Sequence, residues 1–125
     1  MEIQNGCNHS CTFCIIPQGR GLSKSVPMDT ILEKIRNLVN KGFKEIVLTG
    51  VDITCWGSDI AGNDKLGDLV NYILNETPDL PRLRLSSLDV SEMDDNLLHV
   101  FKTNKRMMPH LHLSLQSGNN LILKR

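Results

Sequence analysis

The sequence predicts an α/β fold in which strands and helices alternate around a parallel sheet. Stretches with apolar residues at i, i+3, i+4 and i+7 alternate with short apolar runs along the 125 residues. Gly and Pro residues separate these stretches. Such alternation implies right-handed crossovers, which bring the carboxyl ends of the strands to one edge of the sheet. We therefore expect the order β-α-β-α-β-α-β, with functional loops gathered on one rim.

The first part of the chain predicts a strand, a loop and a helix. Residues 1–4 are expected to form a short strand, and residues 15–26 contain Pro and Gly residues that break any periodicity. Apolar residues then recur with helical spacing over residues 28–39. Pro27 is typical of a helix start, and Gly42 is typical of the position just past a helix end.

The remaining elements follow the same alternation. Residues 44–49 contain a continuous apolar run, which is typical of a buried parallel strand. Helical spacing marks residues 66–74 and 93–101, and alternating patterns predict strands over 82–87 and 111–115. A Rossmann fold is excluded because no GxGxxG joins a strand to a helix.

Polar residues follow each predicted strand. Three cysteines come after the first strand, and the segments 49–52, 86–89 and 116–118 end the other three. Parallel strands would bring all four groups together at one rim, where α/β folds bind their ligands. Each segment taken alone is equally compatible with ordinary turn chemistry.

The cysteines form the most informative pattern, CxxxCxxC over Cys7, Cys11 and Cys14. Three thiolates so close in sequence can converge on one inorganic centre, and three is one fewer than the four that hold most iron–sulfur clusters. An open coordination position is where a substrate binds in catalytic metal sites. The alternatives are a zinc site completed by His9 or a distant group, a CxxC redox pair, and a structural disulfide.

Composition limits the class of protein. Lys and Arg number 14, as do Asp and Glu, so the net charge of zero does not indicate nucleic-acid binding by itself. Aromatic residues make up only 4%, so platforms for base stacking are scarce. No apolar run is long enough to span a membrane, and free cysteines without a secretory leader lead us to expect a cytoplasmic protein with no membrane partner.

The cysteine motif, with an aromatic residue before its last cysteine, resembles the signature of the radical S-adenosylmethionine (SAM) superfamily. The resemblance implies that Cys7, Cys11 and Cys14 hold a 4Fe–4S cluster whose open iron binds SAM, and that Phe13 packs near the SAM adenine. A reduced cluster would cleave SAM to methionine and a 5′-deoxyadenosyl radical. The chemistry then belongs to the cofactors, so no side chain is expected to be catalytic. An electron donor such as flavodoxin or ferredoxin is implied.

Longer stretches resemble the methylthiotransferase branch of this superfamily. Within that branch, the sequence is closest to members that add a methylthio group to carbon 2 of N6-threonylcarbamoyladenosine beside the tRNA anticodon. Sister members act on isopentenyladenosine in tRNA or on an aspartate of a ribosomal protein. The matching stretches are 6–8, 14–17, 20–25, 45–54, 83–88 and 112–118.

The resemblance also assigns a SAM pocket. It predicts that SAM contacts Gly50, Asp52, Ser86, Ser87 and Gln116. Arg20 could hold an anionic group with its planar guanidinium, or could simply be a solvated loop charge. Cys55 departs from the family pattern and is expected to be a bystander thiol.

Members of this branch resemble a three-part enzyme. We expect residues 1–125 to be part of its radical SAM core, a (β/α) TIM-like barrel truncated after the fourth strand. An N-terminal domain with a second 4Fe–4S cluster and a C-terminal domain that docks tRNA would lie in the full-length protein. We expect the 125 residues alone to be inactive on tRNA. Truncation would also leave Leu111, Leu113 and Leu115 uncovered at an open sheet edge.

Overall fold

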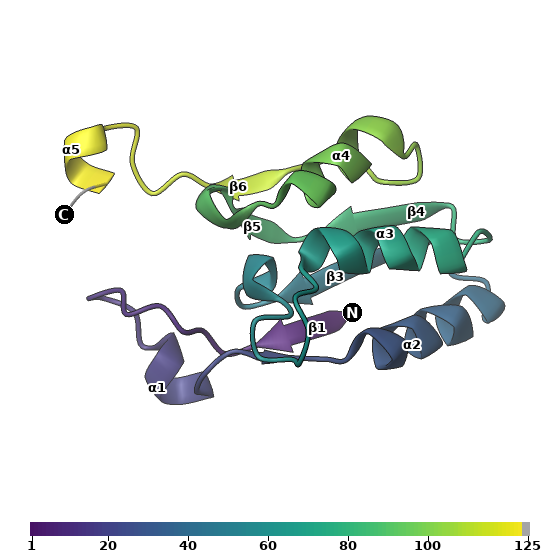
Figure 1. The fold of residues 1–125 in the computed structure, drawn as a ribbon, viewed down its shortest axis with the longest axis horizontal. Coiled ribbons are helices and arrows are strands. Elements are labelled where there is room, and N and C mark those ends of the chain that lie inside the picture. Colours follow the sequence, from purple (N-terminus) through teal and green to yellow (C-terminus); the bar gives the residue numbers. More distant parts are fainter. Residues whose placement is uncertain (124–125) are drawn as a thin grey trace.

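The computed structural model describes residues 1–123 (Figure 1). It contains a four-stranded sheet. Strands β1 (Glu2–Asn5), β3 (Glu45–Gly50) and β4 (Arg82–Leu85) run parallel to one another. The two-residue strand β2 (Lys24–Ser25) adds to the edge of β1 in the antiparallel sense, which gives the order β2-β1-β3-β4. The sequence-based expectation of an α/β fold with a parallel sheet is therefore confirmed.

A second, smaller sheet continues from the first. It pairs β5 (Ser87–Asp89) with β6 (His112–Ser114) in the parallel sense. The helices and the two short 3₁₀ segments lie between these strands along the chain, except for α5, which follows β6. They are α1 (Ile16–Arg20), α2 (Met28–Asn40), η1 (Ile53–Cys55), α3 (Leu66–Glu76), η2 (Val90–Glu92), α4 (Asp95–Thr103) and α5 (Asn120–Leu123).

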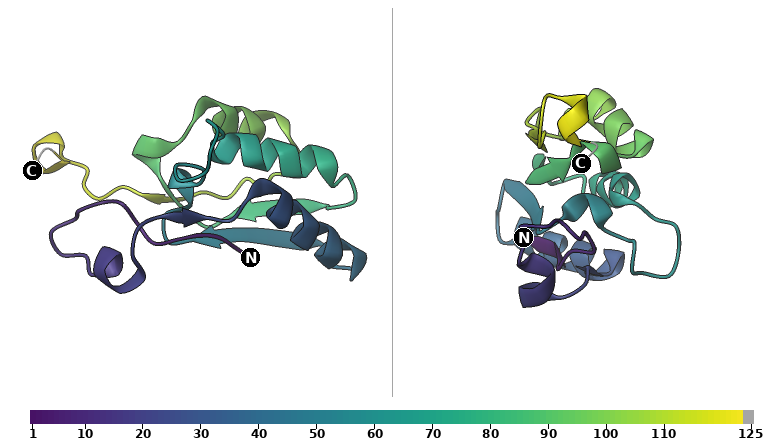
Figure 2. Two further views of the ribbon diagram at one scale, coloured as in Figure 1. Left: turned by 60° about the horizontal axis from the view of Figure 1, so that its bottom comes forward. Right: turned by 90° about the vertical axis from the view of Figure 1, so that its left-hand side faces the viewer.

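Helices α2, α3 and α4 lie on the same side of the sheet (Figure 2, left). Their apolar faces meet the buried strand residues, so Ile31 and Ile35 of α2 and Ile73 of α3 join Leu48 and Leu85 of the strands in one hydrophobic core. All five of these side chains are fully buried or nearly so. Burial of the apolar faces, more than helix propensity, holds helices of this length on a sheet.

The longer elements follow the sequence pattern closely. Helix α2 begins directly after Pro27, and Gly42 just beyond its end has a φ of +90°, a left-handed conformation that Gly adopts without steric cost. Helix α3 begins where Lys65 donates its backbone N–H to the Asp68 carboxylate at 2.9 Å. That contact satisfies a backbone donor at the helix start, as capping carboxylates do.

Two expectations are wrong. The segment 15–26 is not simply a loop, because it contains α1 and β2. The predicted strand over 82–87 is divided between β4 and β5, and these belong to different sheets.

The predicted strand over 111–115 is present as β6, and the segment before it makes a separate contact with the sheet. Met107 forms a parallel bridge with Leu83 of β4, but the next N–H on that side, that of His110, donates to the carbonyl of Met108 at 2.7 Å, and pairing resumes only at β6 against β5. The last strand therefore runs beside β4 and β5 in two short pieces.

The carboxyl ends of the strands lie at one end of the molecule, at the left in Figure 1. The loop after β1, the segment after β3 and η2 after β5 all lie toward this end. Among the residues that the structure describes, no helix combines the length and apolar character needed to cross a lipid bilayer.

Candidate functional site

The cysteine loop begins directly after β1 and is anchored at its base. Gly6 has a φ of +74°, and a Cβ at this position would collide with the carbonyl oxygen of Leu22. Only Gly therefore fits where the loop leaves the sheet. The backbone N–H of Cys7 then donates to the carbonyl of Gly21 at 3.1 Å, which closes the loop against the segment before β2.

The three motif cysteines are free thiols on this loop. Cys7 and Cys14 are partly buried and Cys11 is exposed. A turn joins the last two, because the N–H of Cys14 donates to the carbonyl of Cys11 at 3.1 Å. The described part of the chain thus presents three thiols from one loop, with none of them paired in a disulfide.

Asp52, which follows β3, lies against the cysteine loop. Its carboxylate is 3.8 Å from the sulfur of Cys7 and 3.2 Å from Nε2 of His9. Burial raises the pKa of the Cys7 thiol, and the nearby Asp52 carboxylate raises it further. A metal that binds this sulfur must therefore displace a proton.

Four potential metal ligands converge beside Cys7. They come from three segments (the cysteine loop, residues 52–55 around η1, and η2), and one ligand atom of each lies within 4.8 Å of the others: His9, Asp52, Cys55 and Glu92. Nε2 of His9 is 2.9 Å from Oε1 of Glu92, and the Cys55 thiol lies 3.2 Å from Oε2 of the same carboxylate. Burial, followed by the hydrogen bond to Glu92, raises the pKa of Cys55. Imidazole, thiol and carboxylates of this kind suit zinc or ferrous iron.

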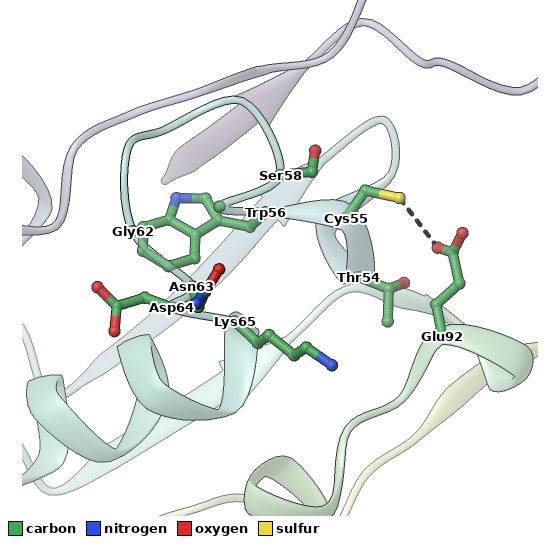
Figure 3. A pocket seen from close by; sticks show the side chains of 10 residues that line it. Thr54, Cys55, Trp56, Ser58, Gly62, Asn63, Asp64, Lys65 and Glu92 are labelled. Atoms are coloured by element: carbon green, nitrogen blue, oxygen red, sulfur yellow. Dashed lines mark hydrogen bonds between the residues drawn. The ribbon is translucent and has the colours of Figure 1, made fainter.

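A pocket of about 470 Å³ adjoins this cluster (Figure 3). Cys55 and Glu92 belong both to the cluster and to the pocket wall. The loop from η1 to the start of α3 forms most of the remaining wall. Its lining residues are Thr54, Trp56, Gly57, Ser58, Gly62, Asn63, Asp64 and Lys65. In Figure 3 the Lys65 side chain extends along the same side as Thr54 and Glu92, whereas the Asp64 carboxylate points away from them.

The predicted SAM-pocket residues differ in how the structure places them. Gly50 and Asp52 lie beside the cysteine loop, and a Cβ at Gly50 would lie 2.8 Å from the carbonyl oxygen of Gln4. Ser86 donates its N–H to the carbonyl of Leu48 at 3.0 Å, and its buried hydroxyl has no hydrogen-bond partner within the described residues.

The other predicted residues are exposed. Phe13 is 87% exposed, and Gln116 is also exposed on the segment after β6. The hydroxyl of Ser87 lies 2.9 Å from Nδ1 of His112 on the neighbouring strand. Arg20 donates from Nη1 to the side-chain oxygen of Asn5 at 3.3 Å, so its guanidinium lies at the base of the cysteine loop.

Sequence reasoning missed the contribution of Glu92 and treated Cys55 as a bystander. Both belong to the set of residues around Asp52, because β5, which leads directly into η2, packs against η1. No local motif links these positions, which are far apart in the sequence. Only the spatial arrangement of the two short 3₁₀ segments could have revealed them.

The residues present fit a cluster held by three cysteines together with a polar ligand. The loop offers three thiols, one fewer than the four that hold most iron–sulfur clusters. One iron of such a cluster would therefore have no thiolate ligand from this loop. The unpartnered hydroxyl of Ser86 and the carboxylate of Asp52 are polar groups that a ligand with hydroxyl and ammonium groups would satisfy.

Comparison with known proteins gives a match along the whole chain. Residues 1–125 match the radical SAM superfamily. The chain is 50% identical over 125 residues to a protein of Rickettsia prowazekii named threonylcarbamoyladenosine tRNA methylthiotransferase MtaB. It is 43% identical over 124 residues to a protein of the same name from Aquifex aeolicus.

A third relative carries a different name. The tRNA-2-methylthio-N(6)-dimethylallyladenosine synthase of Herpetosiphon aurantiacus is 40% identical over 124 residues. The matches cover 99–100% of this chain but only 28–30% of the relatives. The chain therefore spans less than a third of the length of these curated relatives.

Proposed function

Because the chain belongs to the radical SAM superfamily, we propose that Cys7, Cys11 and Cys14 hold a 4Fe–4S cluster and that SAM binds at its open iron. The observation that carries this proposal is the loop of three free thiols, with the Cys7 sulfur 3.8 Å from the Asp52 carboxylate at the carboxyl end of the sheet. When bound, the cluster supplies the electron that cleaves SAM to methionine and a 5′-deoxyadenosyl radical.

The residues of the chain bind, orient and shield these groups. Asp52 supplies a carboxylate for the SAM ammonium group, and Gly50, which has no side chain, leaves room for Gln4 and Ile53 to pack against the backbone of this segment. Ser86 supplies a hydroxyl that already lies in a buried position without a partner. We assign Phe13, Ser87 and Gln116 to the rest of the SAM pocket on the family resemblance alone.

We propose that the whole enzyme is a tRNA methylthiotransferase that acts on N6-threonylcarbamoyladenosine. The relatives with 50% and 43% identity carry that name, which favours this acceptor over the dimethylallyladenosine of the relative with 40% identity. Residues 1–125 then form part of its SAM-cleaving core, a portion of a (β/α) barrel. Recognition of tRNA, a second cluster and reduction by a flavodoxin- or ferredoxin-type donor are assigned to the whole enzyme.

The first test is anaerobic reconstitution with iron and sulfide. We expect iron and sulfide in near-equal amounts, a visible absorption band, and loss of both in Cys11→Ala. Cys11 suits this test because its side chain is exposed and Ala keeps the carbonyl that Cys14 contacts. The matched control is Cys55→Ser, which removes a thiol outside the motif and should retain the cluster.

Binding of zinc alone would contradict the proposal, above all if zinc binding required Cys55 and not Cys11. If the cluster forms, the next measurement is release of 5′-deoxyadenosine from SAM with a strong reductant. The acceptor is then decided with the whole enzyme and two tRNA samples, one carrying the threonylcarbamoyl group and one the dimethylallyl group. Mass spectrometry should find the methylthio product only in the first sample.

A further inference from the structure

Gln4 lies on β1 and is 1% exposed, although its neighbours in the core are apolar. A buried amide is costly unless its hydrogen-bonding groups are satisfied. All of the groups on the Gln4 amide have partners, and these partners belong to two different loops of the candidate site. This arrangement distinguishes Gln4 from a polar residue that is satisfied only by its own strand.

The amide nitrogen of Gln4 donates hydrogen bonds to the segment that carries the cysteine loop. Nε2 donates to the carbonyl of Gly6 at 2.8 Å and to the hydroxyl of Ser23 at 2.9 Å. Gly6 directly precedes Cys7, and the N–H of Ser23 donates to the side-chain oxygen of Asn8 at 2.9 Å. Gly6 and Ser23, the two ends of the segment 6–23 that contains the cysteines, are thus tied to one amide group.

The amide oxygen of Gln4 accepts a hydrogen bond from the segment that follows β3. Oε1 accepts the backbone N–H of Asp52 at 2.8 Å. The surroundings determine which amide atom is the oxygen and which the nitrogen, because Oε1 faces the N–H of Asp52 and Nε2 faces the carbonyl of Gly6. Gly50 pairs with Gln4 across the strands, and a Cβ there would lie 2.9 Å from Oε1. The missing side chain at Gly50 therefore makes room for this contact.

We propose that Gln4 is a positioning residue that couples the cysteine loop to the Gly50–Asp52 segment, so that the cluster and the SAM ammonium group are held at a constant separation. The role assigned to Gln4 rests on the cluster and SAM sites proposed above. Gln4 does not touch the reacting atoms. It fixes the backbone of the two segments that carry the proposed cofactor ligands, the cysteine loop and the segment 50–52.

The test compares Gln4→Met with Thr77→Val. Met has a similar length but removes every hydrogen bond of the amide. Thr77 is a matched control because it is also buried, and its hydroxyl donates to the carbonyl of Ile73 within α3, away from the site. The first readout needs no cofactor: amide hydrogen exchange at Asp52 should be at least about tenfold faster in Gln4→Met and unchanged in Thr77→Val.

The second readout is the Kd for SAM in the reconstituted chain at equal iron content. We expect Gln4→Met to bind SAM about tenfold more weakly, the effect of losing one or two hydrogen bonds. Thr77→Val should lower thermal stability without changing this Kd. Unchanged Asp52 exchange and unchanged SAM affinity in Gln4→Met would overturn the role of Gln4.

A third variant keeps the test decisive if Gln4→Met does not fold. Gln4→Glu preserves the acceptor for the Asp52 N–H but loses the donors to Gly6 and Ser23. In this variant, hydrogen exchange at Asp52 should stay as slow as in the wild type, whereas less iron and sulfide should be retained. A variant that also retains wild-type amounts of iron and sulfide would overturn the proposal. If the wild-type chain binds no cluster, the proposed function fails, whereas hydrogen exchange at Asp52 still decides whether Gln4 joins the two loops.

Discussion

Ser86 is the residue, within the described part of the chain, whose buried side-chain oxygen has no hydrogen-bond partner. An unsatisfied buried hydroxyl costs about 1–3 kcal/mol of folding free energy. The residue lies just past β4, at the end of the sheet where the cysteine loop and Asp52 lie. The chain therefore loses folding stability at a hydroxyl group that a polar ligand could satisfy with a hydrogen bond. Such a loss is typical of functional sites.

We predict that Ser86→Ala has opposite effects on folding and on ligand binding. Removal of the unpartnered hydroxyl should raise the free energy of unfolding of the cofactor-free chain by up to about 1 kcal/mol. The same change should weaken SAM binding to the reconstituted chain. Urea unfolding and SAM titration measure the two effects.

Ser87→Ala serves as the control for stability, because the Ser87 hydroxyl is exposed and already lies 2.9 Å from His112. It should bring no gain in the free energy of unfolding. A loss of stability in Ser86→Ala would show that this hydroxyl has a partner in the folded chain.

At the scale of elements, two arginines of β4 bind one carboxylate of β3. Nε of Arg84 donates to Oε1 of Glu45 at 2.7 Å, and Nε of Arg82 donates to Oε2 at 2.8 Å. Both hydrogen bonds lower the pKa of the Glu45 carboxyl, and the one from Arg84 has the larger effect. The residues face each other at the start of the parallel pair, so the contact helps to align the strands.

The lowered pKa predicts a specific pH dependence of stability. Because the folded chain favours the ionised carboxylate, this contribution is present above the ordinary Glu pKa of 4.5 and is lost as the pH falls through the lower pKa of the folded state. Urea unfolding between neutral and acidic pH should therefore show a difference between wild type and Glu45→Gln that shrinks below about pH 4.5.

Glu33→Gln provides the comparison, since Glu33 on α2 is exposed and forms no salt bridge among the described residues. A difference for Glu45→Gln that did not change with pH would contradict an electrostatic origin of the contact.

The sequence predicts these elements well where the pattern is local and long. Helix α2 has a full apolar stripe and therefore begins and ends close to the predicted residues. Helix α1 has five residues and no such stripe, so its pattern is that of a loop. The division between β4 and β5 depends on a distant segment that pairs first at Met107 and then at β6, which no local pattern encodes.

The same distinction holds for the candidate site. Cys7, Cys11 and Cys14 are recognisable because their spacing alone brings three thiols onto one loop. The convergence of Cys55 and Glu92 depends on how η1 and η2 pack, and the role of Gln4 depends on the register between β1 and β3. These contacts join segments far apart in the chain, and they follow from the fold as a whole.

At the scale of the whole molecule, apolar side chains are exposed along one end of the chain. They lie on β6, on α5 and beside them: Leu111, Leu113, Leu115, Leu121, Ile122 and Leu123. Leu113 is 40% exposed and Leu115 is 69% exposed. Apolar side chains exposed on and near a short strand favour association between chains.

We predict that the 125-residue chain self-associates with rising concentration and that Leu113→Lys with Leu115→Lys reduces this association. A charge at each position disfavours burial against a second chain. Sedimentation velocity over a series of concentrations measures the effect. Leu98→Lys on α4 is the control, because Leu98 is 38% exposed but lies outside this group. A wild-type chain that stays monomeric at every concentration would refute the prediction.

Trp56 is the only tryptophan of the chain, and it forms part of the pocket wall beside Cys55. Its indole is 3% exposed and donates from Nε1 to the carbonyl of Val26 at 3.0 Å. The tryptophan fluorescence of the protein therefore comes from a single indole with fixed surroundings next to the candidate site. Its emission wavelength and lifetime report on this one loop without any attached label, and a coloured prosthetic group nearby would quench it by energy transfer.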